Sequence, residues 1–196
     1  MPRIPATVPT HPEPPFDAFE VLDLSGTADP RVTAEQVCAA DHASYDAPLR
    51  ASLAKIERLC SAFPEGVRLC VGRAEGIWHP VGYTAWHPIA RHLLDDLTTW
   101  PANVPVDREG AEVAYLFNFS VAPVLLGSDV ARRLMQELNE AVRGFPVMAA
   151  DVVSAHGRRA ATRWGMEPRA SQLRNGQAWE LWVSKTERRG LSPGEQ

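Results

Sequence analysis

The segment Ala111–Gly144 has the residue types and the spacing that suit the binding of an anion. Val113–Val121 places apolar side chains on both faces of an alternating pattern, which predicts a central strand. Pro123 ends this strand, the loop Val124–Gly127 follows, and apolar residues at helical spacing predict a helix over Ser128–Arg143. The first amides of a helix have no partner within the helix and lie at its positive end. The segment therefore predicts a phosphate site, although plain packing of a helix on a strand accounts for the same pattern.

The elements that must hold this segment alternate along the chain. Apolar residues recur at helical spacing in some stretches and alternate with polar residues in others. In chain order the patterns predict a strand at 19–24, helices at 29–45 and from Pro48 to Phe63, strands at 67–71 and 81–85 around a turn at 74–76, a short helix at 92–100, a strand at 147–153, a helix at 156–164 and strands at 170–174 and 177–185.

Three local signals set boundaries in this pattern. Thr33 and Gln36 have the spacing of a capping box at a helix start. Pro48 suits the first turn of the second helix, because proline lacks the N–H that a first turn leaves unused. Asn175-Gly176 is typical of a two-residue turn between antiparallel strands, and it predicts a hairpin near the end of the chain.

The composition is that of a globular chain with one domain. It has 196 residues, of which 45% are hydrophobic, and a formal net charge of −4. Six prolines within residues 1–16 predict an extended tail. The polar residues 188–196 predict a second tail, which leaves the domain at 17–187.

Charge, hydropathy and cysteine content exclude several classes of function. The sequence has no basic stripe, so no nucleic acid is expected as a partner. It has no run of about 18 apolar residues for a membrane span and no apolar run of a signal peptide, which predicts a cytoplasmic protein that does not act on a membrane. Its three cysteines, Cys38, Cys60 and Cys70, lack the spacing of a zinc site, and no histidine spacing supports a metal, so no metal is expected.

Residues 121–134, which read VAPVLLGSDVARRL, resemble the pyrophosphate-loop motif of the GNAT acyltransferases. In that motif a strand ending in Val-x-Pro is followed by Arg/Gln-x-x-Gly-x-Gly/Ala and then by a helix. Leu126 stands at the Arg/Gln position, Asp129 at the first glycine and Ala131 at the final Gly/Ala. Gly165-Met166 resembles the Gly-Phe pair of the family, and the similarity extends over residues 67–185.

The resemblance implies both a fold and a co-substrate. The fold would be α/β, with a mixed, mostly antiparallel sheet that splays in a V and has helices on both faces. The co-substrate would be acetyl-CoA or another acyl-CoA, whose pantetheine arm pairs with the backbone at Phe119, Ser120 and Val121. Its pyrophosphate would meet the amides at the start of the following helix, which are those of Leu126, Gly127, Ser128, Asp129, Val130 and Ala131.

Two departures from the motif bear on this binding. Leu126 offers the pyrophosphate no charge, and the carboxylate of Asp129 would repel it. The alternative for Asp129 is a place in the first helical turn with its side chain pointing away, where the helix dipole favours an acidic residue. Arg132 or Arg133 would then offset its charge.

The resemblance also suggests which residues take part in catalysis. A carboxylate of the central strand often acts as the general base; Glu112 is our first choice, while Tyr115 occupies the usual position. The structural alternatives are an exposed charge at the strand start for Glu112 and a core aromatic for Tyr115. Ala161 stands where the family often has a tyrosine that protonates the thiolate. Ser154 stands where the family often has a pantetheine-binding asparagine, and either a catalytic hydrogen bond or a helix N-cap suits it.

The resemblance thus implies an N-acyltransferase that moves an acyl group, with acetyl as the first choice, from CoA to a small-molecule primary amine. Residues 88–110 would form one wall of the acceptor site, because variable loops often carry specificity. His79 and His87 would line the acceptor pocket, or else are buried in the core. Two other functions remain open: transfer from a longer acyl-CoA or an acyl carrier protein, and a catalytically degenerate protein that only binds a ligand or a partner. A homodimer through the last hairpin is compatible with each of these.

Overall fold

The computed structural model describes residues 16–26, 29–94, 106–126, 128–174 and 176–184. Most of both predicted tails, most of the predicted helix at 92–100, and Gly127 lie outside these ranges. In chain order the strands (β), helices (α) and 3₁₀ turns (η) are β1 (Ala18–Asp23), α1 (Pro30–Ser44), η1 (Ala47–Leu49), α2 (Leu53–Ala62), η2 (Pro64–Gly66), β2 (Val67–Ala74), β3 (Ile77–Ile89), η3 (Arg91–Leu94), β4 (Val113–Val121), η5 (Pro123–Leu125), α3 (Asp129–Ala141), β5 (Val147–Val152), α4 (Ala155–Arg163), β6 (Met166–Arg174) and β7 (Gln177–Ser184).

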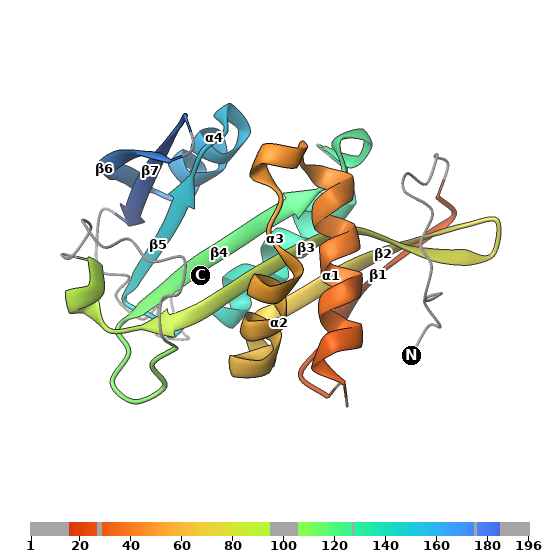
Figure 1. The fold of residues 1–196 in the computed structure, drawn as a ribbon, viewed down its shortest axis with the longest axis horizontal. Helices are drawn as coiled ribbons and strands as arrows, with labels where there is room; N and C mark the ends of the chain where they lie inside the picture. The colour runs from red at the N-terminus through yellow and green to blue at the C-terminus, as the bar shows by residue number, and fades with distance from the viewer. Residues whose placement is uncertain (1–15, 27–28, 95–105, 127, 175, 185–196) are drawn as a thin grey trace, which may run out of the picture. The chain divides into compact units, whose positions relative to one another are not determined.

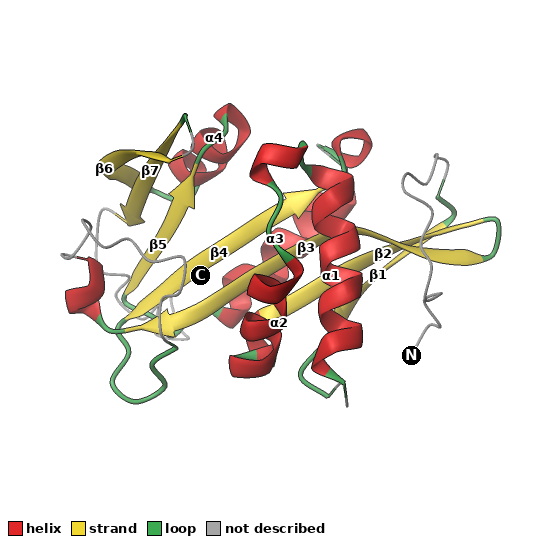
Figure 2. Cartoon of the chain, in the orientation of Figure 1, coloured by secondary structure: helices red, strands yellow, loops and turns green. Residues whose placement is uncertain are grey.

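The strands form one mixed sheet within the described residues. Its order is β1-β2-β3-β4-β5-β7-β6. β1 pairs antiparallel with β2, β2 with β3, β5 with β7 and β6 with β7, whereas β4 and β5 run parallel. Figure 2 shows these strands in yellow and the helices in red. The α/β class and the mostly antiparallel sheet expected from the sequence are therefore confirmed.

The chain divides into two compact units. The first unit comprises Met1–Ala85 and Phe119–Glu140, and the second comprises Trp86–Asn118 and Ala141–Gln196. β3 begins in the first unit and ends in the second, whereas β4 begins in the second unit and ends in the first. Each unit is therefore made of two separate stretches of the sequence.

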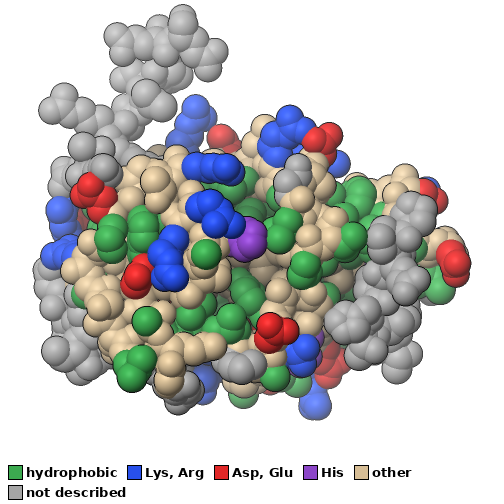
Figure 3. Space-filling view, turned by 90° about the horizontal axis from the view of Figure 1, so that it is seen from above, with side chains coloured by type: hydrophobic (Ala, Val, Ile, Leu, Met, Phe, Trp, Pro, Cys, Tyr) green, Lys and Arg blue, Asp and Glu red, His purple; other side chains and the backbone are tan. Residues whose placement is uncertain are grey.

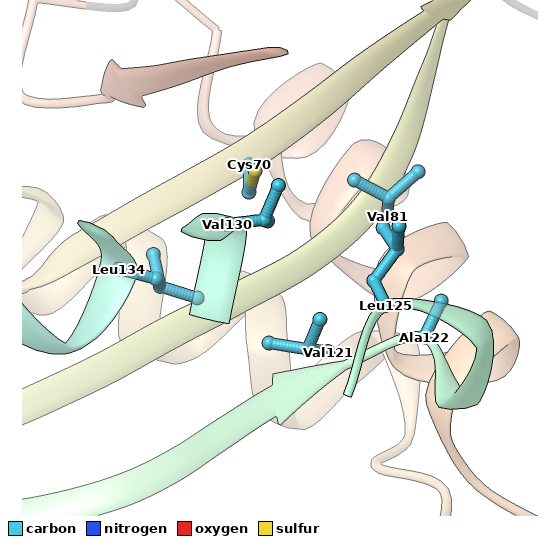
Figure 4. Packing of buried hydrophobic residues seen from close by; sticks show 7 residues of the cluster. All are labelled: Cys70, Val81, Val121, Ala122, Leu125, Val130 and Leu134. Carbon is cyan, nitrogen blue, oxygen red and sulfur yellow. The ribbon is translucent and has the colours of Figure 1, made fainter. Parts of the chain in front are cut away.

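In the first unit, helices cover both faces of the strands. Figure 1 shows α1 and α2 in front of β2 and β3, and α3 behind them. Behind the strands, apolar residues of β2, β3, β4, η5 and α3 form one core cluster, which we call the α3 cluster. Its buried members are Cys70, Val81, Val121, Ala122, Leu125, Val130 and Leu134. Figure 4 shows these side chains gathered between the strands and the start of α3, so the turn after β4 and the first turns of α3 are held against the sheet.

The first helix begins at a different cap from the predicted one. The side chain of Asp29 accepts hydrogen bonds from the amides of Arg31 and Val32, which is the usual role of an N-cap carboxylate. Thr33 is buried within the helix, and its hydroxyl donates to the carbonyl of Asp29. The capping box predicted at Thr33 and Gln36 is therefore wrong, because the helix starts one turn earlier.

The second helix begins later than predicted. Pro48 lies in the short turn η1, and α2 starts at Leu53 with Ser52 as its N-cap, whose hydroxyl accepts from the amide of Lys55. The buried face of α2 consists of Ile56, Leu59 and Cys60. A helix from Pro48 onward is wrong, because the polypeptide turns between Ala47 and Ser52.

The hairpin of β2 and β3 forms as predicted but is longer. Glu75 and Gly76 make its turn with φ of 52° and 78°, a left-handed pair that suits a tight hairpin. β3 then continues for 13 residues to Ile89, and nearly all of them are buried. The prediction stopped at Ala85, because the tryptophan, histidine and proline that follow break the regular alternation.

The second unit has its own core. Apolar residues from the end of β3, η3, the first part of β4, β5 and β7 form one cluster, whose buried members are Ile89, Leu94, Val113, Tyr115, Val147, Ala149 and Leu181. α4 contacts β5 and β6. The predicted hairpin at Asn175-Gly176 is confirmed, with Arg174 paired to Gln177.

The described surface is mixed in character. On the face drawn in Figure 3, basic, acidic and hydrophobic side chains all reach the surface, as is usual for a globular protein. No helix in the described ranges is both long enough and apolar enough to cross a membrane. Among the same residues, no three histidine, cysteine or acidic side chains lie together in a way that would hold a metal ion.

Candidate functional site

The last part of β4 extends beyond its neighbour β5. The two strands pair from Val113, opposite Val147, to Leu116, opposite Ala150. β4 continues to Val121, so its last five residues lie past this ladder. The backbone edge of these residues includes the segment Phe119–Val121, for which the sequence predicts contacts to pantetheine.

The hydrogen-bonding edges of this segment follow from its contacts with β3. The amide of Ala122 donates to the carbonyl of Val81 at 2.7 Å, and the carbonyl oxygen of Ser120 lies 2.7 Å from the position that a Cβ on Gly82 would take. Backbone groups of successive strand residues point to opposite edges. Since Ser120 and Ala122 face β3, the carbonyl of Phe119 faces the other edge, on which β5 pairs further back along the strand.

The side chains of the same segment point to two faces. Val121 is buried in the α3 cluster, and Phe119 packs against it. Ser120 points to the opposite face, as strand geometry requires. It is only 4% exposed, and its hydroxyl has no hydrogen-bond partner among the described residues. The backbone of Ser120 faces β3 and its hydroxyl is buried, so the predicted contact of Ser120 with CoA remains a prediction.

In the turn after β4, several amides donate hydrogen bonds to carbonyl groups of the same turn. The amide of Leu125 donates to Ala122 at 2.8 Å, that of Leu126 to Pro123 at 3.2 Å and that of Ser128 to Leu125 at 3.1 Å. Two amides that the sequence predicts for the pyrophosphate, those of Leu126 and Ser128, thus already have acceptors within the turn. Each of these amides could donate to a phosphate only by sharing its hydrogen between two acceptors.

The start of α3 offers the remaining predicted amides. The amide of Arg132 donates to the carbonyl of Ser128 at 3.4 Å, which makes Ser128 the residue before the first turn. The amides of Asp129, Val130 and Ala131 belong to that turn, where helix geometry gives them no acceptor within the helix. The hydroxyl of Ser128 donates to the carbonyl of Leu125 at 2.6 Å. The three amides of the first turn are therefore the part of the prediction that the geometry favours most.

Asp129 forms an ion pair in this first turn. Its carboxylate bonds the guanidinium of Arg132, three residues later, and 82% of the Asp129 side chain is exposed. The charge of Asp129 is thus partly neutralised by its own helix, and its position favours the dipole-stabilised alternative. Val130 is buried in the α3 cluster and Ala131 packs against the same cluster.

The turn also exposes apolar side chains. Val124 is 56% exposed and Leu126 is 49% exposed. Leu126 is the residue that replaces the Arg or Gln of the motif, so a solvent-facing hydrocarbon stands in place of a charged or amide side chain.

In the second unit, Glu112 and Tyr115 lie near the beginning of β4. Glu112 is exposed, and its carbonyl accepts from the amide of Val147 at 3.2 Å. Tyr115 is 5% exposed within the second core, and its ring lies 5.2 Å from that of His87. Tyr115 lies in the part of β4 that is paired with β5, and Glu112 directly precedes the first residue of this strand. Their predicted catalytic roles remain predictions, with Tyr115 placed as a core aromatic.

Ser154 is the N-cap of α4. Its hydroxyl accepts from the amide of Gly157 at 3.0 Å, which is the structural alternative weighed for this residue. Ala161 is buried in the same helix, at the place where the resemblance expects a tyrosine. A role for Ser154 toward pantetheine remains a prediction. In that role the same hydroxyl would bind pantetheine and accept from the amide of Gly157. α4 itself contains no tyrosine.

The two histidines of β3 are both buried. His79 is 7% exposed and His87 is 4% exposed. His79 lies in the first unit and pairs with Gly72 of β2. His87 belongs to the second unit. This placement favours the core alternative over a role in lining an acceptor pocket.

A buried polar group in the first unit escaped the sequence analysis. Asp41 is fully buried in α1; one carboxylate oxygen accepts from the hydroxyl of Tyr83 at 2.7 Å and the other from the amide of Ala51 at 2.8 Å. One turn later, the hydroxyl of Tyr45 donates to the carbonyl of Phe119 at 3.4 Å. The available signal was an acidic residue on the apolar face that also carries Ala34, Val37 and Cys38.

Burial changes the acidity of several of these groups. Desolvation raises the pKa of Asp41, and the hydrogen bonds from Tyr83 and Ala51 counteract only part of this shift. Burial and the nearby Asp41 raise the pKa of Tyr45 well above its ordinary value. Burial also raises the pKa of Cys60 to about 11 and that of Cys70 to about 12. All of these groups are thus held in their protonated forms more strongly than in water.

Comparison with solved structures places this fold among known ones. The loading GNATL domain of CurA from Lyngbya majuscula has a TM-score of 0.64 at 14% identity, over 86% of this chain and 98% of that domain. The GNAT-like decarboxylase GphF in complex with isobutyryl-CoA has a TM-score of 0.59 at 19% identity, over 85% and 98%. A mosquito arylalkylamine N-acetyltransferase, like 5b, has a TM-score of 0.56 at 15% identity, over 85% and 99%.

Sequence comparison adds no closer relative. No protein-family model and no curated protein sequence matches the chain. At identities of 14–19% the structural likeness shows a shared fold, and the GNAT-like architecture implied by residues 121–134 is thereby confirmed.

Proposed function

We propose, from the GNAT fold of this chain, that it transfers an acyl group from CoA to a small-molecule primary amine, with acetyl-CoA as the first donor. The observation that carries the proposal is the continuous unit of β4, turn and α3. Its strand extends past β5, and its helix begins directly after the turn with three amides that have no acceptor within the helix. A helix start of this kind is suited to the pyrophosphate of CoA.

The packing of this unit supports the proposal. Val121, Leu125 and Val130 are all buried in the α3 cluster, so strand, turn and helix share one core. A site whose backbone is held in place loses little conformational freedom when a ligand binds. We therefore propose that Phe119–Val121 and the first turn of α3 form the donor site in advance of binding, with the amides of Asp129, Val130 and Ala131 as the main contacts to phosphate.

The proposed chemistry requires little of the protein beyond position and proton transfer. The amine nitrogen attacks the thioester carbon, the C–S bond breaks, and the nitrogen loses a proton as the sulfur gains one. Holding the two reactants together replaces an encounter in solution, and this effect supplies much of the rate enhancement in such reactions. Glu112 as base and Ser154 as a hydrogen-bond donor are part of the proposal, whereas Tyr115 is a weaker candidate because it is buried in the second core.

The decisive experiment is calorimetry followed by turnover. We expect acetyl-CoA to bind with a micromolar dissociation constant, and a panel of small primary amines to release free CoA from it. Absence of heat with millimolar acetyl-CoA and with millimolar CoA would show that the first turn of α3 does not hold a pyrophosphate. Binding without turnover of any amine would favour the degenerate, ligand-binding alternative.

A second candidate donor follows from the exposed turn. Val124 and Leu126 present hydrocarbon where the motif of the family carries a charged or amide side chain. A donor with a longer acyl chain, or one carried on an acyl carrier protein, needs fewer contacts to phosphate. Comparison of kcat/KM for acetyl-, butyryl- and octanoyl-CoA tests this candidate, and a clear preference for acetyl would reject it.

The thiols are compatible with a reducing compartment. Cys38, Cys60 and Cys70 are all free and buried. We therefore propose that the protein acts in the cytoplasm, where thiols remain reduced.

A further inference from the structure

Tyr45 places a hydroxyl on the part of β4 that the proposed function assigns to the acyl donor. The phenol donates to the carbonyl of Phe119 at 3.4 Å, across 74 positions of the sequence. This carbonyl faces away from β3, as the contacts of Ser120 and Ala122 show. The hydroxyl of Tyr45 therefore lies at the strand edge where a pantetheine arm would pair, and it belongs to the same unit of the protein as that edge.

The backbone that carries Tyr45 is held from several directions. Its amide donates to the carbonyl of Asp41 at 3.0 Å, and its carbonyl accepts from Nε of Arg50 at 2.9 Å. Arg50 also donates to the carbonyl of His42 at 3.3 Å, and Asp41 accepts from the amide of Ala51 at 2.8 Å. These bonds connect the end of α1 to the turn that follows it, and they fix the backbone from which the Tyr45 ring extends.

The bond to Phe119, in contrast, is easily exchanged. Its length of 3.4 Å is at the long end for a hydroxyl donor. A carbonyl oxygen has two lone pairs, so an amide of pantetheine can bind it beside the phenol or displace the phenol. The last amide of pantetheine is separated from the sulfur by two carbons, about the rise of one strand residue. A donor whose last amide pairs at Phe119 would therefore bring its sulfur within reach of the Tyr45 hydroxyl.

We propose that Tyr45 is a catalytic residue that donates a hydrogen bond to the leaving sulfur. The inference rests on the proposed function and deepens it. In the reaction, the amine forms the N–C bond and the C–S bond breaks with its electron pair on the sulfur. The O–H of Tyr45 stabilises this thiolate, and the proton that neutralises it comes from the nitrogen of the adduct. Tyr45 itself begins and ends as a phenol, so atoms and charge balance.

Two further observations agree with this role. The pKa of Tyr45 is raised by burial and by Asp41, so the group remains a hydrogen-bond donor over the whole physiological range and is unsuited to act as a base. α4 carries Ala161 where the resemblance expects a tyrosine, so α4 supplies no phenol for the sulfur. Tyr45 at the end of α1 supplies one.

The test compares Tyr45→Phe with Tyr83→Phe. Each change removes one tyrosine hydroxyl from the first unit, but the hydroxyl of Tyr83 bonds the carboxylate of Asp41, whereas that of Tyr45 bonds the backbone of β4. We expect Tyr45→Phe to lower kcat by about 10- to 100-fold, the usual effect of losing a hydrogen bond to a developing charge, with the dissociation constant of CoA changed less than about threefold. Tyr83→Phe should lower the unfolding midpoint and leave kcat per folded molecule within about twofold.

A second measurement separates catalysis from structure. In the complex with CoA, a hydrogen bond from Tyr45 to the sulfur lowers the pKa of the bound thiol, which is followed by thiolate absorbance against pH. We expect this lowering in the wild-type protein and in Tyr83→Phe, and its loss in Tyr45→Phe. An unchanged kcat with an unchanged thiol pKa in Tyr45→Phe would overturn the inference while leaving the proposed function intact. A wild-type protein that binds no CoA would overturn the proposed function and this inference together.

Discussion

At the scale of single residues, Asp129 bears most directly on the phosphate site proposed at the start of α3. It departs from the glycine of the motif, yet its carboxylate is paired with Arg132 and largely exposed. The pair leaves a residual negative charge beside the three amides of the first turn. The charge would oppose a pyrophosphate without excluding it.

Removal of this charge is therefore expected to strengthen donor binding. Asp129→Asn should lower the dissociation constant of CoA by about three- to tenfold, since one charge a few ångströms from a phosphate in water is worth about 1 kcal/mol. The matched control is Glu137→Gln, which removes the same charge about 12 Å further along the helix. Calorimetry at low and high salt distinguishes the two, because salt screens the effect. Equal affinities in both variants would show that the phosphates bind elsewhere.

Asp41 sets a pH dependence of stability. Burial raises its pKa above the ordinary value, so between that value and the raised one the folded protein binds more protons than the unfolded chain. Stability therefore falls as the pH rises through this window. Asp41→Asn has no such titration, so the free energy of unfolding of the wild type relative to this variant should decrease from about pH 4 upward. Urea unfolding at several pH values checks it, and a relative stability that increases with pH would contradict it.

At the scale of elements, β3 and β4 approach each other closely in the first unit. A Cβ on Gly82 would lie 2.7 Å from the carbonyl oxygen of Ser120 and 3.1 Å from Cα of Val121. Both atoms are backbone, so a side chain at this position would force the strands apart. The glycine is thus required by the contact that orients the edge of β4.

Gly82→Ala should accordingly destabilise the fold by about 1–3 kcal/mol, the usual cost of overpacking. Gly144→Ala is the control, because a Cβ there meets no atom within 4 Å, and it should stay within about 0.5 kcal/mol of the wild type. Denaturant unfolding gives both values. Equal stabilities for the two variants would mean that the strands can separate without cost.

Local periodicity explains how much of these elements the sequence predicts. Val113–Val121 and the helix after it were predicted almost to the residue, because their apolar spacing is regular and long. The start of α2 and the last residues of β3 were missed, because proline, tryptophan and histidine obscure the pattern there. The site follows the same rule: the first turn of α3 is local and predictable, whereas the bond from Tyr45 to Phe119 joins residues 74 positions apart, which no spacing reveals.

At the scale of the whole molecule, the three thiols report on the first unit. Cys38, Cys60 and Cys70 all belong to it and are buried. Their pKa values are raised by burial, to about 11 for Cys60 and about 12 for Cys70. A thiol in this state reacts slowly, since the thiolate is the nucleophile, so labelling requires the unit to open.

We therefore expect a thiol reagent to label the three cysteines slowly at pH 8. We also expect bound CoA to slow this labelling further. A ligand at 100 times its dissociation constant reduces the open population by about 100-fold if it binds only the closed form. Labelling rates with and without CoA, read by mass spectrometry, check this. Rapid labelling in the absence of denaturant would show that the first unit opens readily, and the same rate with saturating CoA would show that the donor does not bind this unit.

The discontinuity of the two units has a consequence for the newly made chain. The first 85 residues contain α1, α2, β1 and β2, but the partners that complete their core, the end of β4 and α3, lie at Phe119–Glu140. During synthesis, the apolar face of Cys70 and Val81 cannot be covered until Phe119–Glu140 has left the ribosome. The order of translation thus keeps this surface uncovered for some fifty residues of elongation, and an interval of this kind is where chaperones act on a nascent polypeptide.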